Sequence, residues 1–117
     1  MSLEAKLTTL LLAQCPRVFP DVAPWDTARP YITYQQIGGP ALVYVEGVLP
    51  AERSAWVQVN VWADTRLAAT ALMLQVESAL VAATTLSAKP QAGMQAMHDD
   101  DTGRKGSSQD FEIWADR

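Results

Sequence analysis

The spacing of hydrophobic residues changes at Asp64, and this change predicts the centre of the fold. Before it, Val57, Val59 and Val61 alternate with Trp, Gln and Asn, which is the two-residue period of a β-strand. After it come about five turns of Ala- and Leu-rich sequence with high helix propensity. Asp64 and Thr65 are both good N-cap residues. A strand that leads directly into a helix supplies both layers of a two-layer core.

Leucines near the N-terminus predict a first helix. Leu3, Leu7, Leu10 and Leu11 recur at three- and four-residue spacing, and the helix must end before Pro16. The apolar run is short and interrupted by threonines, so neither a signal peptide nor a membrane span is expected. The second helix is apolar nearly all round. We therefore expect the first helix, a neighbouring subunit or both to cover it.

Four further runs have the character of β-strands. Residues 31–37 and 42–49 precede the central strand, residues 56–62, and these three runs together predict an antiparallel meander. Residues 92–98 and 110–115 follow the second helix and predict a closing hairpin. The predicted order of elements is α-β-β-β-α-β-β.

This order predicts an α+β fold, in which residues 1–117 form a single two-layer domain. The expected sheet is mostly antiparallel with four to five strands, and two helices pack on one face. Residues 16–30 carry four prolines, which exclude a regular helix and a central strand, so a loop is expected there. A break is expected at residues 86–90. Residues 99–109 hold three aspartates, two glycines and two serines and are expected to form a mobile hairpin tip.

Charge and cysteine content narrow the function. The chain has 13 acidic and 9 basic residues and a net charge of −4, so a nucleic-acid-binding surface, which needs a basic patch, is disfavoured. Cys15 is the single cysteine, which excludes a disulfide within the chain, and no Cys/His cluster has the spacing of a metal site. Nothing in the composition points to an oxidising compartment, and the cytoplasm is the expected location.

Candidate catalytic residues are few. Asp99, Asp100 and Asp101 form the most conspicuous charged cluster, but the EF-hand spacing is absent and a solvated hairpin tip is the preferred interpretation. The single histidine, His98, and Cys15 lie in no motif of nucleophilic catalysis. We therefore predict no catalytic, cofactor-binding or metal-ligating residues, and we do not expect an enzyme.

Aromatic side chains on the outer face of the sheet are the stronger signal. If the valines of the central strand, and Phe111 and Ile113 of the last strand, point toward the helices, then the alternation turns three tryptophans the other way, among polar residues. These are Trp56, Trp62 and Trp114. Large exposed aromatics mixed with polar residues are typical of a protein interface. Cover by the termini or by the loop at residues 16–30 is the alternative. Trp25, within that loop, is expected to pack against the core or the loop itself, with a contact to a partner protein as its alternative.

Two stretches of sequence carry a resemblance to a known family. The first is Pro30-Tyr-Ile-Thr-Tyr, and the second is Trp56-Val-Gln-Val-Asn-Val-Trp-Ala-Asp-Thr, which runs into the helix at residues 68–80. With the closing hairpin, they make the chain similar to the small tail-completion family of long-tailed bacteriophages and prophages, which is related in fold to the tail terminator proteins. The resemblance covers residues 1–85.

The resemblance implies a non-enzymatic structural protein at the head-proximal end of a phage tail. Such a protein stops growth of the tail tube, often as a hexameric ring, and presents a surface to the head connector. Its implied partners are further copies of itself, the tail tube protein and the head-connector protein, and the isolated chain can be monomeric. It would reside in the bacterial cytoplasm during assembly and then in the virion tail.

The acidic balance agrees with this implied role, because a conduit through which DNA slides should repel phosphates. Glu46, Asp99, Asp100 and Asp101 are the candidates for acids that face a lumen or lie at a loop tip.

Two other classes of protein stay open. The first is a host-encoded ligand-binding or regulatory α+β domain that dimerises through the tryptophan face, and a dimer that binds a metabolite would support it. The second is a small hydrolase that uses Cys15 or His98, and loss of a measured activity on mutating Cys15 would support it.

Overall fold

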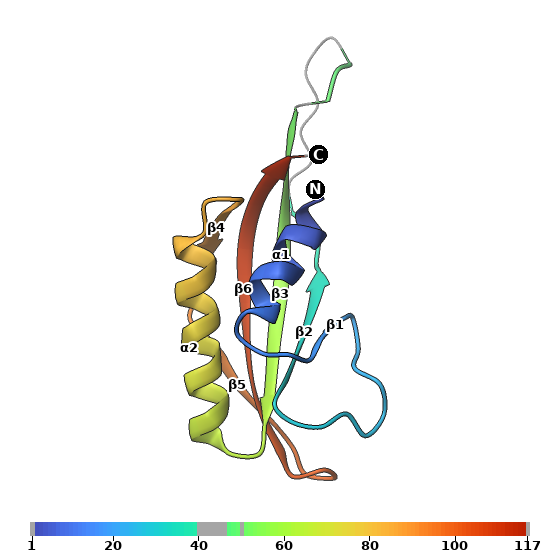
Figure 1. The fold of residues 1–117 in the computed structure, drawn as a ribbon, viewed down its shortest axis with the longest axis vertical. Helices are drawn as coiled ribbons and strands as arrows, with labels where there is room; N and C mark the ends of the chain where they lie inside the picture. Colours follow the sequence, from blue (N-terminus) through green and yellow to red (C-terminus); the bar gives the residue numbers. More distant parts are fainter. Residues whose placement is uncertain (1, 40–46, 50, 117) are drawn as a thin grey trace.

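Two long antiparallel strands form the middle of the sheet. In this computed structural model, residues 2–39, 47–49 and 51–116 are described. Strand β3 (Glu52–Ala63) pairs with strand β6 (Arg104–Asp116) along all 12 of its residues, from Glu52 opposite Asp116 to Ala63 opposite Lys105. Both strands extend along the length of the molecule (Figure 1). Of the other elements, β2, β4 and β5 hydrogen-bond to this pair and both helices pack against it.

The remaining strands flank the central pair. On one side, β2 (Tyr31–Gln36) pairs antiparallel with β3, and the edge strand β1 (Val18–Pro20) pairs parallel with β2. On the other side, β4 (Ser87–Pro90) and β5 (Gln95–Asp99) both pair antiparallel with β6, one after the other along its length. The described residues thus form a six-stranded mixed sheet in the order β1-β2-β3-β6-β4, with β5 also on β6.

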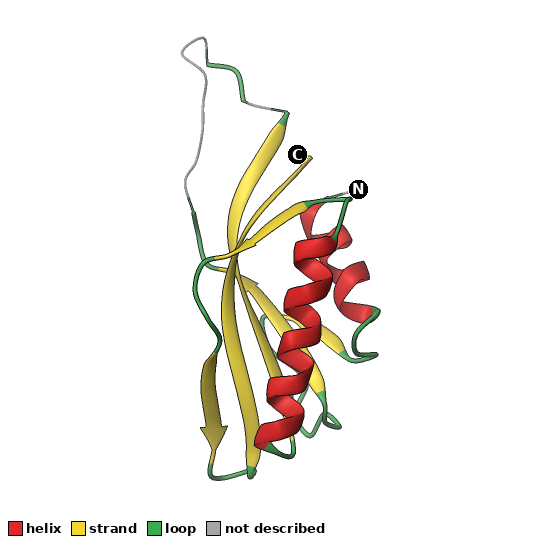
Figure 2. Cartoon of the chain, turned by 90° about the vertical axis from the view of Figure 1, so that its left-hand side faces the viewer, coloured by secondary structure: helices red, strands yellow, loops and turns green. Residues whose placement is uncertain are grey.

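Both helices lie on the same face of this sheet (Figure 2). Helix α1 (Leu3–Leu12) begins at Ser2, whose hydroxyl accepts a hydrogen bond from the backbone N–H of Ala5 at 3.2 Å. Helix α2 (Arg66–Ala82) begins at Thr65, whose hydroxyl caps the N–H of Ala68 at 3.1 Å. Each hydroxyl satisfies one of the four N–H groups that have no partner at the start of a helix.

The core lies between the helices and the sheet, because alternate residues of each strand point toward the helices. The predicted inward face of the central strand and the predicted leucine stripe of the first helix are confirmed. Met73 of the second helix is also fully buried. The core is made of Leu3, Leu7, Leu11, Ile32, Val57, Val59, Val61, Leu72, Met73, Val76, Leu80, Phe111 and Ile113.

The predicted α+β class with two helices on one face is confirmed, but several strand assignments differ. The expected meander is wrong, because β2 pairs directly with β3 and the run at residues 42–49 does not lie between them. That run falls mostly outside the described residues, and its described end, residues 47–49, forms no strand. The direct pairing places Ile32 opposite Val61, which extends the apolar face of β3 across a second strand.

Two proline-containing segments form edge strands rather than loops. Residues 18–20 of the predicted loop form β1, and residues 87–90 of the predicted break form β4. Each strand has one neighbour and ends at a proline, Pro20 and Pro90, where the missing N–H costs no hydrogen bond in the middle of a sheet.

The closing hairpin is longer than predicted. β6 already begins at Arg104, and the turn is confined to residues 100–103. Most of the segment expected to form a mobile tip is therefore strand. Its polar residues are buried under α2, where Ser107 and Gln109 are almost fully shielded from solvent.

Hydrogen bonds from α2 hold this polar part of the core. The Arg66 guanidinium donates to the carbonyl oxygens of Gly106 at 2.6 Å and Met97 at 2.5 Å. The Gln109 side-chain amide donates to the Glu77 carboxylate at 2.6 Å and to the carbonyl of Ala92 at 2.9 Å. The two charged residues of α2 are thus used to attach the helix to β5, β6 and the segment before β5.

Gly106 is predicted to tolerate no side chain. A Cβ atom there would lie 2.7 Å from the Trp62 ring and 3.0 Å from the carbonyl oxygen of Val61. We expect Gly106→Ala to lower the free energy of unfolding by about 1–3 kcal/mol, the usual cost of overpacking. The measurement is urea unfolding followed by tryptophan fluorescence. Gly93→Ala is the matched control, because nothing lies within 4 Å of its Cβ position; equal losses in both variants would contradict the prediction.

Candidate functional site

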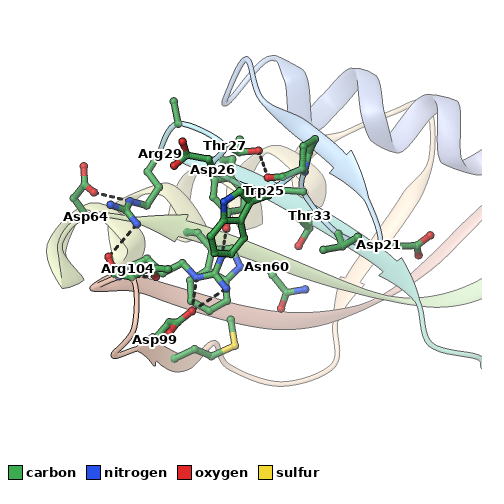
Figure 3. Close-up of a pocket in the computed structure, with 18 residues that line it drawn as sticks. Asp21, Trp25, Asp26, Thr27, Arg29, Thr33, Asn60, Asp64, Asp99 and Arg104 are labelled. Carbon is green, nitrogen blue, oxygen red and sulfur yellow. Dashed lines mark hydrogen bonds and ion pairs between the residues drawn. The ribbon is translucent and has the colours of Figure 1, made fainter.

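A hollow of about 820 Å³ lies on the face of the sheet opposite the helices. The segment between β1 and β2, residues 21–30, forms one wall, and strands β2, β3, β5 and β6 form the floor and the other wall (Figure 3). The floor and wall residues of the strands are Tyr31, Thr33, Asn60, Trp62, Met97, Asp99 and Arg104.

Arg104 is the central side chain of the hollow. Its guanidinium carbon lies 4.3 Å from the centre of the Trp62 ring, a stacked cation–π contact. It forms an ion pair with Asp99 at 3.1 Å and donates a hydrogen bond to the Tyr31 hydroxyl. Gly106 is the residue directly opposite Trp62 in the sheet, and its lack of a side chain leaves room for the indole ring. The cation is therefore fully engaged within the chain.

The surroundings of Asp99 lower the pKa of its carboxyl group and so favour the charged form that pairs with Arg104. Desolvation acts to raise the pKa of Asp99, but hydrogen bonds from the N–H of Asp101 and from Thr102, together with the charge of Arg104, outweigh it. The net result is a pKa below the ordinary value of 3.8. Asp99 is thus ionised at neutral pH and joins the end of β5 to the start of β6.

A second ion pair closes the rim of the hollow. Arg29 donates to the Asp64 carboxylate at 2.6 Å and to the carbonyl of Thr102 at 3.4 Å (Figure 3). These contacts connect the 21–30 segment with the β3–α2 turn and with the tip of the β5–β6 hairpin. Both arginines of the hollow therefore hold carboxylates already.

The charge of the hollow does not suit a phosphate ligand. Its lining contains four aspartates, Asp21, Asp26, Asp64 and Asp99, and two arginines, both of them paired. The excess of negative charge disfavours an anionic ligand. Across the described residues, no three His, Cys, Asp or Glu side chains gather into a metal site.

The four tryptophans considered as interface candidates occupy three different places. Trp62 is half-buried beneath Arg104 in the hollow. Trp56 and Trp114 lie further along the same face, and both are neighbours of Glu112. Trp56 is opposite Glu112 in the sheet, and the Trp114 indole donates a hydrogen bond to the Glu112 carboxylate at 2.9 Å. Of these three side chains, Trp56 is the most open to solvent, at 38%.

Trp25 departs from the expectation. Its side chain is 92% exposed, so the preferred interpretation, packing against the core or the loop, is wrong. The backbone around it explains the exposure: Asp21 and Asp26 adopt left-handed conformations, and the Thr27 hydroxyl donates to the carbonyl of Pro24 at 2.5 Å. These local constraints shape a loop that turns its indole outward.

The predicted acids differ in their surroundings. Asp99 is the partner of Arg104, whereas Asp100 and Asp101 lie in the exposed hairpin turn. Asp100 is 3.7 Å from the imidazole of His98, which is itself exposed. Glu46 lies outside the described residues.

The two candidate catalytic side chains are not brought together into a site. Cys15 is buried in the core, with its sulfur 3.4 Å from the carbonyl of Pro30. His98 is exposed on β5, on the face of the sheet opposite to that of Trp62.

Neither helix described here has the length and apolar character that a membrane-spanning helix requires.

The cluster of Arg104, Asp99, Tyr31 and Trp62 was missed at the sequence level. Arg104, Gly106 and Ser108 are spaced two residues apart, as residues on one face of a strand are. The glycine and serine in this segment favoured a turn instead, because both residue types are common in turns.

Comparisons with known proteins identify the family. A family model described as "Tail completion protein gp17" matches residues 3–116, which confirms the resemblance seen in the sequence and extends it through the closing hairpin. Among solved structures, a chain of the "Virion of native gene transfer agent (GTA) particle" has a similar fold, with a TM-score of 0.66 and 18% sequence identity over 99% of this chain and 96% of that chain. No curated protein matches the sequence.

The ion pair in the hollow predicts a specific dependence of stability on pH. Because the pKa of folded Asp99 lies below its unfolded value, its contribution is fully present above about pH 4 and is lost as the pH falls through the folded pKa. Wild-type protein should therefore be more stable than Asp99→Asn at pH 7, and the gap should close below about pH 4.

Urea midpoints of the two proteins at several pH values between neutral and acid test this prediction. Asp101→Asn is the matched control, since its carboxylate forms no ion pair among the described residues and its removal should leave the midpoint nearly unchanged at every pH. A gap between wild type and Asp99→Asn that persisted at low pH would show that the carboxylate charge is irrelevant.

Proposed function

The chain belongs to the tail completion protein gp17 family, and from this premise we propose that it caps the growing tail tube and joins it to the head connector. It is a structural protein of a phage-type tail. In the proposed role it acts as a ring of identical copies, with hexamers as the expected form. The ring assembles in the bacterial cytoplasm and stays in the virion tail, and its partners are the tail tube protein and the head-connector protein.

The observation that carries this proposal is the extent of the family match. It spans residues 3–116, so the matched unit is the whole folded domain rather than a shared motif. The chemistry of the site agrees with a structural role. The arginines of the hollow are bound to aspartates, and Cys15 is enclosed in the core, so the side chains best suited to catalysis or anion binding are occupied.

The outer face of the sheet supplies a contact surface for a partner in the tail. Trp56 and Trp114 lie there beside Glu112, a mixture of aromatic and charged groups that is typical of interface anchors. We assign this patch to the tube or connector protein. The exposed acids of the hairpin turn, Asp100 and Asp101, are assigned to the wall of the DNA conduit.

The alternative of a dimeric ligand-binding domain depends on the hollow. A ligand would have to displace the Arg104–Asp99 or Arg29–Asp64 pair, or bind beside them against an excess of negative charge. The hollow therefore favours the tail role over metabolite binding.

The first test is the molecular mass of the protein alone and after mixing with the tail tube protein of the same phage or prophage. We expect a ring, or a complex that stops tubes at a fixed length, by light scattering and electron microscopy. The control is the tube protein alone, which should form tubes of varied length. A stable dimer that leaves tube growth unchanged would overturn the proposal and favour the ligand-binding domain.

The conduit assignment predicts an effect on DNA transfer. Reversing both turn acids, with Asp100→Lys and Asp101→Lys, should leave particle assembly intact but slow genome delivery, because cations on the wall would bind the passing phosphates. Single-particle ejection kinetics measure the effect. Glu4→Lys, an exposed reversal on α1, is the matched control. Unchanged ejection in the double variant would remove Asp100 and Asp101 from the conduit.

A further inference from the structure

Helix α2 carries an apolar stripe on its solvent side. Leu67, Leu74 and Val81 are 83%, 50% and 54% exposed. They are spaced seven residues apart, so they lie nearly in line along about 21 Å of the helix. A solvent-facing helix surface normally carries charged and polar residues. This stripe is therefore a surface without its partner in the single chain.

The shape of the stripe suits a bulky side chain from another protein. Ala71 and Ser78 are small, exposed residues that lie between the large ones. They leave two shallow holes of the kind that a knob fills in helix packing. The charged residues of α2, Arg66 and Glu77, do not obstruct these holes, because both are turned toward β5 and β6.

A matching protrusion lies on the other side of the molecule. The 21–30 segment presents Trp25 at 92% exposure and Val22 at 77%. In Figure 1, α2 lies at one side of the molecule and the loop between β1 and β2 at the other. An indole buries roughly 200 Å² when covered, so its full exposure to water is costly.

The charges beside these two surfaces are complementary. Asp26 follows Trp25 directly, and neither Asp26 nor Asp21 belongs to an ion pair within the described residues. At the start of α2, Arg66 bonds to carbonyl and hydroxyl oxygens rather than to a carboxylate. Lys105, the sheet partner of Ala63 just before the helix, is in no ion pair in the described part of the chain. The N-terminal end of the helix dipole adds positive potential there.

We infer that the 21–30 loop of one copy docks on α2 of a second copy, with Trp25 between Leu67 and Leu74 above Ala71. This inference rests on the proposed ring and names its contact. Asp26 then faces the positive start of the helix. Because the two surfaces differ and lie on opposite sides, the contact is head-to-tail and repeats from copy to copy, as closure of a ring requires.

A symmetric contact between two α2 helices explains less. It would cover the stripe, but it would leave Trp25 in water and the aspartates of the loop without partners. The loop-to-helix contact covers both apolar surfaces at once and pairs the charges.

Crosslinking between two single-cysteine variants tests the contact. Ala28→Cys labels the loop, Gln75→Cys labels the edge of the stripe, and both positions are exposed. Native Cys15 is buried and stays unreactive. A short bis-maleimide should join the two variants when they are mixed, and should give little product with either variant alone. The reaction is run on the free protein at high concentration and on protein bound to tube ends.

Further substitutions define the contact. Trp25→Ala in the loop variant, or Leu74→Glu in the stripe variant, should reduce the crosslinked product about ten-fold, as loss of a central aromatic or apolar anchor does. Leu12→Glu, at a residue of α1 that is 47% exposed, is the matched control and should leave the yield unchanged.

The outcomes separate this inference from the proposed function. Crosslinks within the Gln75→Cys variant alone would show a symmetric helix contact and overturn the inference, as would absence of product in both settings. If Trp25→Ala protein stops tube growth as well as wild type, the contact is wrong and the tail role stands. If wild-type protein crosslinks but leaves tubes uncapped, the contact stands and the tail role fails.

Discussion

Pairing of β3 with β6 is the constraint on which the rest of the structure depends. The two strands are joined along all 12 residues of β3, and the two-residue period then sends every valine of β3 to one face and every tryptophan to the other. A slip of one residue would exchange the faces and destroy the core. The helices bury one face, so the register leaves a polar and aromatic surface on the other. The core and the candidate contact surfaces are therefore set by the same hydrogen bonds.

On the outer face of the sheet, the side chain of Arg104 connects four strands. Arg104 stacks on Trp62, pairs with Asp99 and reaches Tyr31, and so connects β2, β3, β5 and β6 without help from the helices. Arg29 extends the arrangement to the 21–30 loop through Asp64. Both arginines that line the hollow are thus paired with aspartates of the same chain and hold neighbouring segments together. The charge that remains in the lining of the hollow is negative, which disfavours binding of phosphate groups there.

Helix α2 has apolar residues on its solvent side as well as on its buried side. Its arginine and glutamate point inward to hydrogen-bond with β5, β6 and the segment before β5, while leucines and a valine face solvent. The buried side of the helix packs in the core, and both of its charged side chains have hydrogen-bond partners on the sheet. Together with the exposed indole on the opposite side of the chain, this exposed apolar stripe is the basis of the proposed head-to-tail contact.

The sequence by itself determined the class of fold, the start of the second helix, the inward face of β3 and the family. These features depend on local periods and caps, which are readable wherever a few neighbouring residues decide the outcome. Tertiary structure decided the rest. Residues 104–109 became strand because β3 and α2 offered partners to a segment whose glycine and serines by themselves favour turns. The direct pairing of β2 with β3, the stacking of Arg104 on Trp62 and the exposure of Trp25 likewise depend on residues far apart in the chain. The residues next to each of these positions do not indicate its partner, because these contacts between distant residues form only when the sheet has formed.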